Sequence, residues 1–397
     1  MRQLVPCFVL GLFDTGLAVV RALGRSGLTV FGFDHQRDEF GFRSKFGVHA
    51  VSPHPRAADG LVAFLCDRAR HCSERPILYP TSHAFVTFVS ENRHTLEPHF
   101  RFALPSCESV SIALNKAAMY ALASEARVPV PCTETPGTLD DVRRLATVVS
   151  YPAVIKPLVG HLWRERYRGD KAIRVDAAPA LVSWFEEILA AEQPALIQSL
   201  VVGPNTNHCK VCGYFDGNGE PRAVICMRKI RQYPVDFGVG TLMETVVEPE
   251  VRELGLRLFR AMNWRGPGSI EFKRDDRDGR WKLIELKPRL WQQHSLADAS
   301  GMNFPLLQYL DLTGQATTVD TYRAGVRWLD EFRDPRSAWE HRKRAALTFT
   351  QWGQSLSGVR AFALWAPDDP APFLAAARHH LSRARRWIAA AQSGAEG

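Results

Sequence analysis

Apolar and polar positions over the first eighty residues follow the order strand, helix, strand. An apolar run covers 4–10, apolar residues at helical spacing follow over 17–25, and a second apolar run covers 28–33. A further apolar strand at 77–82 ends in polar residues, which is where open α/β sheets place ligands. This order predicts a Rossmann-like α/β domain over 1–112.

The turn after the first strand has only part of a dinucleotide-binding pattern. It runs from Gly11 to Gly16 without the middle glycine of G-x-G-x-x-G, and Asp34 ends the second strand. NAD binding with Asp34 on the ribose is therefore an alternative. A Rossmann-like domain that serves another ligand, or only packing, is the favoured interpretation.

Two alternating strands near residue 280 carry the most informative charges. Residues 268–273 and 281–289 flank a turn rich in Asp and Arg that ends in Gly, which predicts a β-hairpin. Glu271 and Glu285 would then lie side by side, and two adjacent carboxylates repel each other unless a cation lies between them. Hard oxygen ligands suit Mg²⁺, which completes its shell with substrate phosphates. The hairpin thus predicts a site for a metal and a nucleotide.

Basic residues mark two further strands. The strand 151–157 carries Lys156 before its last proline, and a loop rich in Gly and Arg leads to Lys171 at the start of the next strand. This loop predicts a flap that closes on phosphates. Lys229 and Arg231 lie two residues apart, so on a strand they share a face, and the two like charges would be stabilised by a common phosphate or carboxylate.

Composition changes the weight given to each lysine. Only 10 of the 50 basic residues are Lys, so Arg is the usual cation of this chain and each Lys position is informative. The net charge of +8 is dispersed, which favours anionic small molecules over nucleic acid. No apolar run is long enough to span a membrane, and the first residues read as a strand instead of a signal peptide, so we expect a cytoplasmic protein.

The eight cysteines do not suggest a metal site. They are spread singly apart from Cys209 and Cys212, which would point to opposite faces of a strand. Reduced, buried thiols are the expected state.

Four motifs in this order resemble the ATP-grasp superfamily. They are Asn115-Lys116, Tyr-Pro-Ala-Val-Ile-Lys156-Pro, Glu271-Phe-Lys and Glu285-Leu-Lys287-Pro-Arg289. The stretch 228–240 is similar to the carboxylate–amine ligase branch, the branch that includes proteins like carbamoyl-phosphate synthase and biotin carboxylase. The resemblance implies an α/β fold of the α+β ATP-grasp type. The implied ranges are a Rossmann-like domain at 1–112, a lid subdomain at 113–197, a subdomain with the Mg-ATP site at 198–315, and a partly helical C-terminal extension at 316–397.

The resemblance also implies roles for single residues. Glu271 and Glu285 match the ligands of one or two Mg²⁺ ions, for which Mn²⁺ is a candidate substitute. Arg289 matches the arginine at the reacting centre, with Arg231 and Lys287 as further catalytic candidates. The implied ATP contacts are Lys116, Lys156, Lys171 and Lys229 at the phosphates, and Gln198, Ser199 and Leu200 at adenine.

Lys287 departs from the family pattern Glu-x-Asn-x-Arg, in which Asn binds a second Mg²⁺. An ammonium cannot coordinate a metal. Either it takes the place of the second cation, or the site binds nucleotide without turnover. The scarcity of lysine in this chain favours the first interpretation.

The implied reaction is ATP-dependent ligation of a carboxylate and an amine through an acyl phosphate. The alternatives are kinase-type activation of an acid or enol oxygen, a non-catalytic ATP-binding regulator and, less favoured, an NAD-dependent oxidoreductase. Expected partners are small carboxylates and amines, with amino acids as candidates, and a homodimer is a candidate assembly. Nucleic acid and membrane are not expected partners. Candidate substrate-selecting residues are Asp14, Thr15, Thr81, Ser82, His83, Trp291, Gln292, Gln293 and His294.

Overall fold

The structure is a computed structural model that describes residues 4–158, 172–315 and 317–393. Two compact units can be distinguished, and each is assembled from separate stretches of chain. The first unit comprises Met1–Leu104, Arg289–Phe332 and Leu356–Gly397, and the second comprises Pro105–Pro288 and Arg333–Ser355. The boundaries expected at residues 112, 197 and 315 stay predictions.

A parallel sheet forms the core of the first unit. Its strand order is β3-β2-β1-β4, and helix α1 (Asp14–Arg25) follows the first strand, as the alternation of strand and helix predicted. The strands are β1 (Cys7–Leu10), β2 (Val30–Asp34), β3 (Val48–Val51) and β4 (Ile77–Pro80). The two apolar strands and the helix expected before residue 35 are therefore confirmed.

The first unit also contains several helices and a second pair of strands. Strands β14 and β15 pair in parallel. The elements are η1 (Phe40–Arg43), α2 (Ala58–Ala69), α3 (His83–Glu91), α4 (Arg93–Leu96), α11 (His294–Ala299), α12 (Phe304–Leu312), β14 (Arg327–Leu329), β15 (Val359–Phe362) and α15 (Ala371–Ser393).

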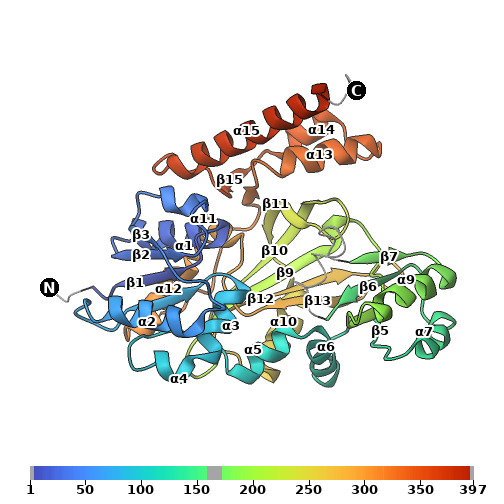
Figure 1. Cartoon of the computed structure of the whole chain (residues 1–397), viewed down its shortest axis with the longest axis horizontal. Coiled ribbons are helices and arrows are strands. Elements are labelled where there is room, and N and C mark those ends of the chain that lie inside the picture. The colour runs from blue at the N-terminus through green and yellow to red at the C-terminus, as the bar shows by residue number, and fades with distance from the viewer. Residues whose placement is uncertain (1–3, 159–171, 316, 394–397) are drawn as a thin grey trace. The chain divides into compact units, whose positions relative to one another are not determined.

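An antiparallel sheet dominates the second unit. Its strands lie side by side in the order β13-β12-β9-β10-β11 (Figure 1). They are β9 (His208–Phe215), β10 (Pro221–Tyr233), β11 (Val239–Val246), β12 (Gly266–Arg274) and β13 (Trp281–Lys287). Both hairpins predicted from turn residues, β9–β10 and β12–β13, are confirmed. Strand β11 was not predicted.

A smaller sheet in the second unit has the order β5-β8-β6-β7. Its members are β5 (Thr133–Glu134), β6 (Ala153–Pro157), β7 (Ile173–Val175) and β8 (Ala195–Ser199). The helices of this unit are α5 (Cys107–Leu114), α6 (Lys116–Glu125), α7 (Leu139–Ala146), α9 (Ala178–Ala190), α10 (Pro249–Ala261), α13 (Asp334–Lys343) and α14 (Phe349–Ser355).

Strict alternation along β9 and β12 gives the larger sheet one apolar and one polar face. Val211, Ile270 and Phe272 are buried in a core that includes residues of α10, such as Leu258. The residues between them on the strands point to the other face, because successive side chains of a strand alternate. The packing of α10 therefore leaves the opposite face of the sheet for the polar side chains, Glu271 among them.

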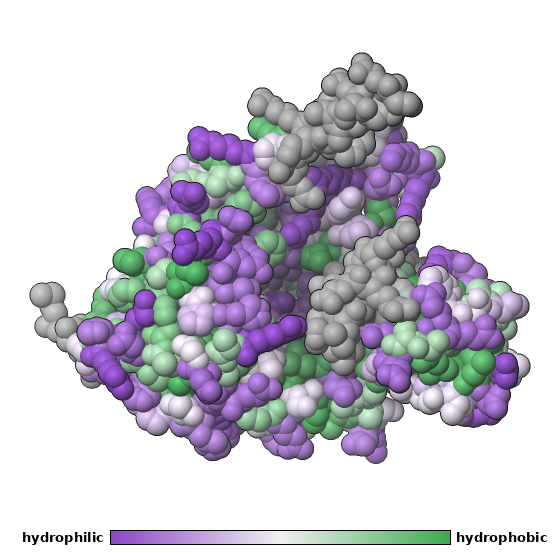
Figure 2. Space-filling view, viewed as in Figure 1, coloured by the Kyte–Doolittle hydropathy of each residue, from purple (hydrophilic) through white to green (hydrophobic). Residues whose placement is uncertain are grey.

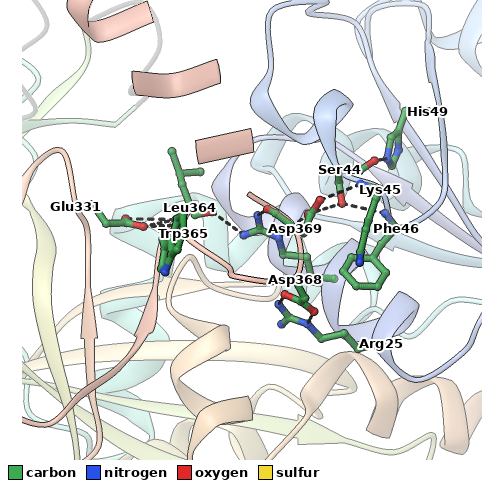
Figure 3. A network of polar contacts seen from close by, with 11 residues as sticks. Arg25, Ser44, Lys45, Phe46, His49, Glu331, Leu364, Trp365, Asp368 and Asp369 are labelled. Atoms are coloured by element: carbon green, nitrogen blue, oxygen red, sulfur yellow. Dashed lines mark hydrogen bonds and ion pairs between the residues drawn. The ribbon is translucent and has the colours of Figure 1, made fainter. Parts of the chain in front are cut away.

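A buried ion pair holds the chain after β15 against helix α1 within the first unit (Figure 3). Arg21 donates from Nε to Asp369 Oδ2 at 2.9 Å, and Ser44 Oγ donates to the same oxygen at 2.8 Å. The main-chain N–H of Lys45 donates to Asp369 Oδ1 at 2.9 Å. Burial lowers the pKa of Arg21, and Asp369 counteracts this by favouring the charged guanidinium.

The visible surface of both units is largely hydrophilic, with scattered hydrophobic positions (Figure 2). Among the described residues, no helix has both the length and the apolar character needed to cross a membrane. The cysteines that the structure describes form no disulfide. Five of them are buried, but Cys107 and Cys132 are exposed and Cys72 is partly exposed, so the expected burial holds only in part.

Adjacent aspartates allow a test of the Arg21 pair. Asp369→Asn should lower the free energy of unfolding by about 3 kcal/mol, because a buried guanidinium loses its counter-charge. Asp368→Asn removes the ion pair between Asp368 and Arg25, in which both side chains are 40% exposed. This change should lower the free energy of unfolding by at most about 1 kcal/mol. Urea denaturation measures both values. Similar losses for the two variants would contradict the importance of burial here.

Candidate functional site

Strands β12 and β13 place the two predicted carboxylates opposite each other. Glu271 is the register partner of Glu285, and a bulge follows at the next pair. The neighbouring strand β9 places Lys210 directly opposite Glu271 on its other side. The predicted proximity of the two glutamates on adjacent strands is confirmed, and the sheet adds a lysine that was not predicted.

Glu271 is the centre of a buried charge cluster. Lys229 Nζ and His208 Nδ1 lie 2.7 and 2.8 Å from its Oε1 atom, and Lys210 Nζ lies 3.7 Å from Oε2. Burial alone would raise the pKa of Glu271, but Lys229, Lys210 and the adjacent His208 ring hold it well below its usual value. Glu271 is therefore an ionised carboxylate at neutral pH.

Burial also shifts the basic members of this cluster. Desolvation lowers the pKa of His208 to about 4, with Lys229 adding to the effect, so the imidazole is neutral at pH 7. Desolvation lowers the pKa of Lys210 to about 8, although Glu271 favours its charged form. At pH 7 the cluster thus contains the Glu271 carboxylate, a neutral imidazole and the charged Lys210, with Lys229 in contact with the carboxylate.

Glu285 lies in a more open position than Glu271. Its side chain is 43% exposed, and Lys287 Nζ lies 2.8 Å from its Oε2 atom. The two residues are separated by one position on β13, so their side chains share a face. The ammonium that replaces the family's Asn therefore contacts one of the two predicted metal ligands.

Two lysines come from outside the larger sheet. Lys156 on β6 donates to Gln198 Oε1 at 2.6 Å, and Gln198 donates in turn to Thr133 Oγ1 at 2.7 Å. Lys116 at the start of α6 donates to the carbonyl of Pro157 at 3.2 Å. Desolvation lowers the pKa of Lys156 to about 8, and the nearby charge of Lys116 contributes. Glu285 and Glu271 act in the opposite direction, so these lysines belong to the same electrostatic environment as the hairpin.

The predicted adenine segment is partly occupied by the protein itself. Ser199 and Leu200 donate their main-chain N–H groups to the carbonyls of Cys132 and Pro152 at 2.9 and 3.0 Å. The carbonyl of Leu200 accepts a hydrogen bond from Arg277 at 2.7 Å. The Gln198 side chain binds Lys156, as described above. The main-chain N–H groups of Ser199 and Leu200 are therefore already used within the protein.

Two further predicted residues make contacts of their own. Arg231 points to Asp334, with Nη2 and Oδ2 2.7 Å apart. Arg289 belongs to the first unit, where its Nη1 donates to the carbonyl of Leu290 at 2.8 Å. Lys171 and the predicted flap loop lie outside the described residues.

Two of the predicted substrate-selecting groups meet within the first unit. Gln292 Nε2 donates to Asp14 Oδ2 at 2.7 Å. Thr81 donates to the carbonyls of Leu10 and Gly11, so its hydroxyl supports the turn after β1. Desolvation lowers the pKa of the buried His294 to about 4.

The structure brings in three residues that the sequence did not single out, namely His208, Lys210 and Asp334. The signal for the first two was available. Lys210 is one of only ten lysines, and His208 lies two positions before it on a predicted strand. Asp334 had no local signal, because its partner Arg231 is 103 positions away in the chain.

Similar solved structures come from several kinds of enzyme. An N5-carboxyaminoimidazole ribonucleotide synthetase bound to ADP matches with a TM-score of 0.63 at 13% identity, over 82% of each chain. The biotin carboxylase domain of Hydrogenobacter thermophilus 2-oxoglutarate carboxylase matches with a TM-score of 0.62 at 16% identity, over 82% of this chain and 74% of that one. An L-amino acid ligase from Bacillus licheniformis matches with a TM-score of 0.61 at 15% identity, over 79% and 77%.

No protein-family model matches the chain, and no curated protein does so at the level of sequence. The structural matches establish the fold. The chain has the mixed α/β ATP-grasp fold, and the resemblance inferred from the four motifs is confirmed at this level. The roles of single residues stay predictions.

The two glutamates can be compared by the same substitution. Glu271→Gln should lower the free energy of unfolding by about 3 kcal/mol, because Lys210 and Lys229 stay buried without their carboxylate. Glu285→Gln removes a half-exposed partner and should cost at most about 1 kcal/mol. Urea denaturation at pH 7 separates the two. Equal losses would show that Glu271 is not the compensating charge of the cluster.

Proposed function

We propose that this chain is an ATP-dependent ligase that joins a small carboxylate to an amine through an acyl phosphate. The observation that carries the proposal is the pair Glu271 and Glu285, opposite each other and surrounded by lysines, on an ATP-grasp fold. Such a site combines carboxylates for a metal with cations for phosphates. Similar folds in an L-amino acid ligase and in carboxylases support the reaction class.

The donor chemistry of the hairpin fits one Mg²⁺. Two carboxylates are the usual protein share of a Mg²⁺ shell, whose other positions go to water and phosphate oxygens. No group of three His, Cys, Asp or Glu side chains in the described part of the chain could hold an ion alone, so the phosphates would have to contribute. Lys287 offers no ligand for a second ion. When bound, Mg²⁺ would neutralise charge on the transferring phosphoryl group.

The lysines would bind the phosphates. At pH 7 Lys156 and Lys210 are below their pKa values of about 8 and therefore charged. A bound polyphosphate favours the ammonium form, because opposite charges within a few ångströms stabilise each other. Lys116 adds a third cation beside Lys156. Lys171 is proposed on the resemblance alone.

The chemistry then follows from position and charge. A carboxylate oxygen attacks the γ-phosphorus in line, its new P–O bond forms as the bond to the ADP oxygen breaks, and an acyl phosphate results. The amine nitrogen attacks the acyl carbon, phosphate leaves, and the nitrogen loses a proton. Arg289, permanently charged and forked, is proposed to stabilise the tetrahedral oxyanion. No side-chain nucleophile is required.

Substrate selection is proposed to lie in the first unit. The contact between Asp14 and Gln292 joins the two stretches that were expected to choose the substrate. A carboxylate and an amide at the end of a parallel sheet suit an amine or amino acid. Amino acids therefore remain the first substrates to test.

One observation favours a non-catalytic alternative, and another counts against an NAD-dependent enzyme. A non-catalytic ATP-binding protein would be consistent with Lys287 at the position of a metal-binding Asn. Against an NAD-dependent enzyme, Asp34 already accepts a main-chain hydrogen bond from Leu12, in the turn after β1, at 2.6 Å and another from Gln36, just after β2, at 3.0 Å. Both carboxylate oxygens thus serve the neighbouring turns.

An ADP-release screen over amino acids and small carboxylates, each with a set of amines, tests the reaction. We expect at least one pair to release ADP, and Glu285→Gln to reduce that rate by at least about 100-fold, since a metal-binding carboxylate near the transferring phosphate is lost. Arg25→Ala, which removes an exposed ion pair and a contact with the Phe46 ring in the first unit, is the control and should keep the full rate.

The outcomes separate the candidates. Thermal stabilisation by Mg·ATP without ADP release for any pair would favour the non-catalytic protein. ADP release with a carboxylate alone, unchanged by amines, would favour an acid kinase. Stabilisation by NAD and not by Mg·ATP would favour the oxidoreductase and exclude the ligase.

The role of Lys287 can be tested by giving the site the family's residue. Lys287→Asn removes the cation beside Glu285, so Mg·ATP binding should become dependent on free Mg²⁺ in excess over ATP, while the natural protein needs none. Titration calorimetry at fixed Mg·ATP and increasing free Mg²⁺ measures this. Lys282→Asn on the same strand, whose lysine pairs with Asp275, is the control. An unchanged Mg²⁺ dependence in Lys287→Asn would rule out the ammonium as a substitute cation.

A further inference from the structure

Helices α13 and α14 are joined to strand β10 by a buried polar network. Arg231 donates from Nε and Nη2 to the two carboxylate oxygens of Asp334, at 3.0 and 2.7 Å. Its Nη1 donates to Ser355 Oγ at 2.7 Å. Thr241 and Trp352 donate to the same carboxylate, which is fully buried. The guanidinium is therefore matched in charge and geometry by the protein itself.

A second contact from α13 leads to the charge cluster. Ser337 Oγ donates to the main-chain carbonyl of Gln232 at 2.7 Å. The Gln232 side chain donates to the carbonyl of Val235 at 2.7 Å and accepts from Lys229 Nζ at 3.0 Å. Lys229 Nζ also donates to Glu271 Oε1 at 2.7 Å. Gln232 thus links α13 to the cluster, with its main-chain carbonyl bonded to Ser337 and its side-chain amide bonded to Lys229, which in turn contacts Glu271.

The backbone at this point cannot orient these side chains through regular pairing alone. The register of β10 with β11 shifts between Lys229 and Arg231 and again between Arg231 and Gln232. A bulge redirects side chains and interrupts the ladder, so their directions must be fixed by other contacts. Both contacts from α13, to Arg231 and to Gln232, fall on this irregular stretch.

We propose that helix α13 positions Lys229 on Glu271, with Gln232, Arg231, Asp334 and Ser337 as positioning residues. This rests on the proposed function, because Glu271 is there a metal ligand. Lys229 has two acceptors, a carboxylate and an amide. The amide of Gln232 keeps the ammonium in place when Glu271 shares its charge with another cation.

The proposal changes the role expected for Arg231. The resemblance made it a catalytic candidate, but a guanidinium that makes three hydrogen bonds to Asp334 and Ser355 is held within the scaffold. Its effect on the site would be indirect, through the direction of β10.

The test uses the full chain and two variants. Ser337→Ala removes the donor to Gln232 with little change in volume, and Gln232→Met removes the amide. Both should weaken the binding of Mg·ATP in titration calorimetry, by about fivefold and about tenfold, as expected for one lost buried hydrogen bond. Ser337→Thr restores a hydroxyl and should restore the affinity. Arg344→Ala cuts an exposed pair between the end of the same helix and Asp236, and should bind as the natural protein does.

A second measurement does not depend on nucleotide binding. The rate at which acetic anhydride modifies Lys229, followed by mass spectrometry against Lys343 as an internal standard, should rise severalfold in both variants, because the ammonium loses a partner or its fixed position. A merely structural role would lower the melting temperature without this selective change.

Each result decides one question. Unchanged affinity and unchanged Lys229 reactivity in a folded Ser337→Ala overturn the positioning role. If the natural protein binds no Mg·ATP, the proposed function fails, and the Lys229 reactivity alone then supports or overturns the positioning. If Gln232→Met does not fold, the proposal is tested by comparing Mg·ATP affinity and Lys229 reactivity between Ser337→Ala and Ser337→Thr.

Discussion

A buried negative charge that must be compensated determines the polar face of the larger sheet. An isolated carboxylate in a protein interior is strongly unfavourable, so Glu271 can be ionised there only with cations around it. The chain supplies them from two neighbouring strands, through Lys210 on β9 and Lys229 on β10. Because side chains alternate on each strand, the same strands pack α10 on the other face. The apolar core against α10 and the charge cluster around Glu271 therefore depend on the same pairing of β9 with β12.

The same requirement applies to two acidic side chains within residues 317–393. Their carboxylates Asp334 and Asp369 are buried and pair with Arg231 and Arg21, each within its own unit. Such pairs specify an arrangement more than they stabilise it, since desolvation offsets much of the attraction. In this region the two ion pairs add specific polar contacts to the packing of buried apolar residues such as Trp328 and Ala376.

This difference sets the limit of what the sequence could predict. Local patterns predicted the β12–β13 hairpin, the strand with Lys156 and the strands and helix before residue 35. These elements could be predicted because alternation and turn residues are recognised within a few neighbouring positions of the sequence. Asp334 and Asp369 could not be found in this way, since their partners lie 103 and 348 positions away. Lys210 was missed although lysine is scarce, because its importance comes from Glu271 on another strand.

Lys229 and Arg231 show how a correct physical premise can lead to an incomplete conclusion. Two like charges on one strand do need anions, and the sequence suggested a shared ligand. The protein provides a separate carboxylate for each, Glu271 and Asp334. The contrast with Lys156 is informative, because its acceptor is the uncharged amide of Gln198 and burial lowers its pKa to about 8. A cation whose charge is so poorly compensated gains most from an incoming phosphate. Within the proposed function, the strongest attraction for a nucleotide should therefore come from Lys156, not from the better paired lysine on β10.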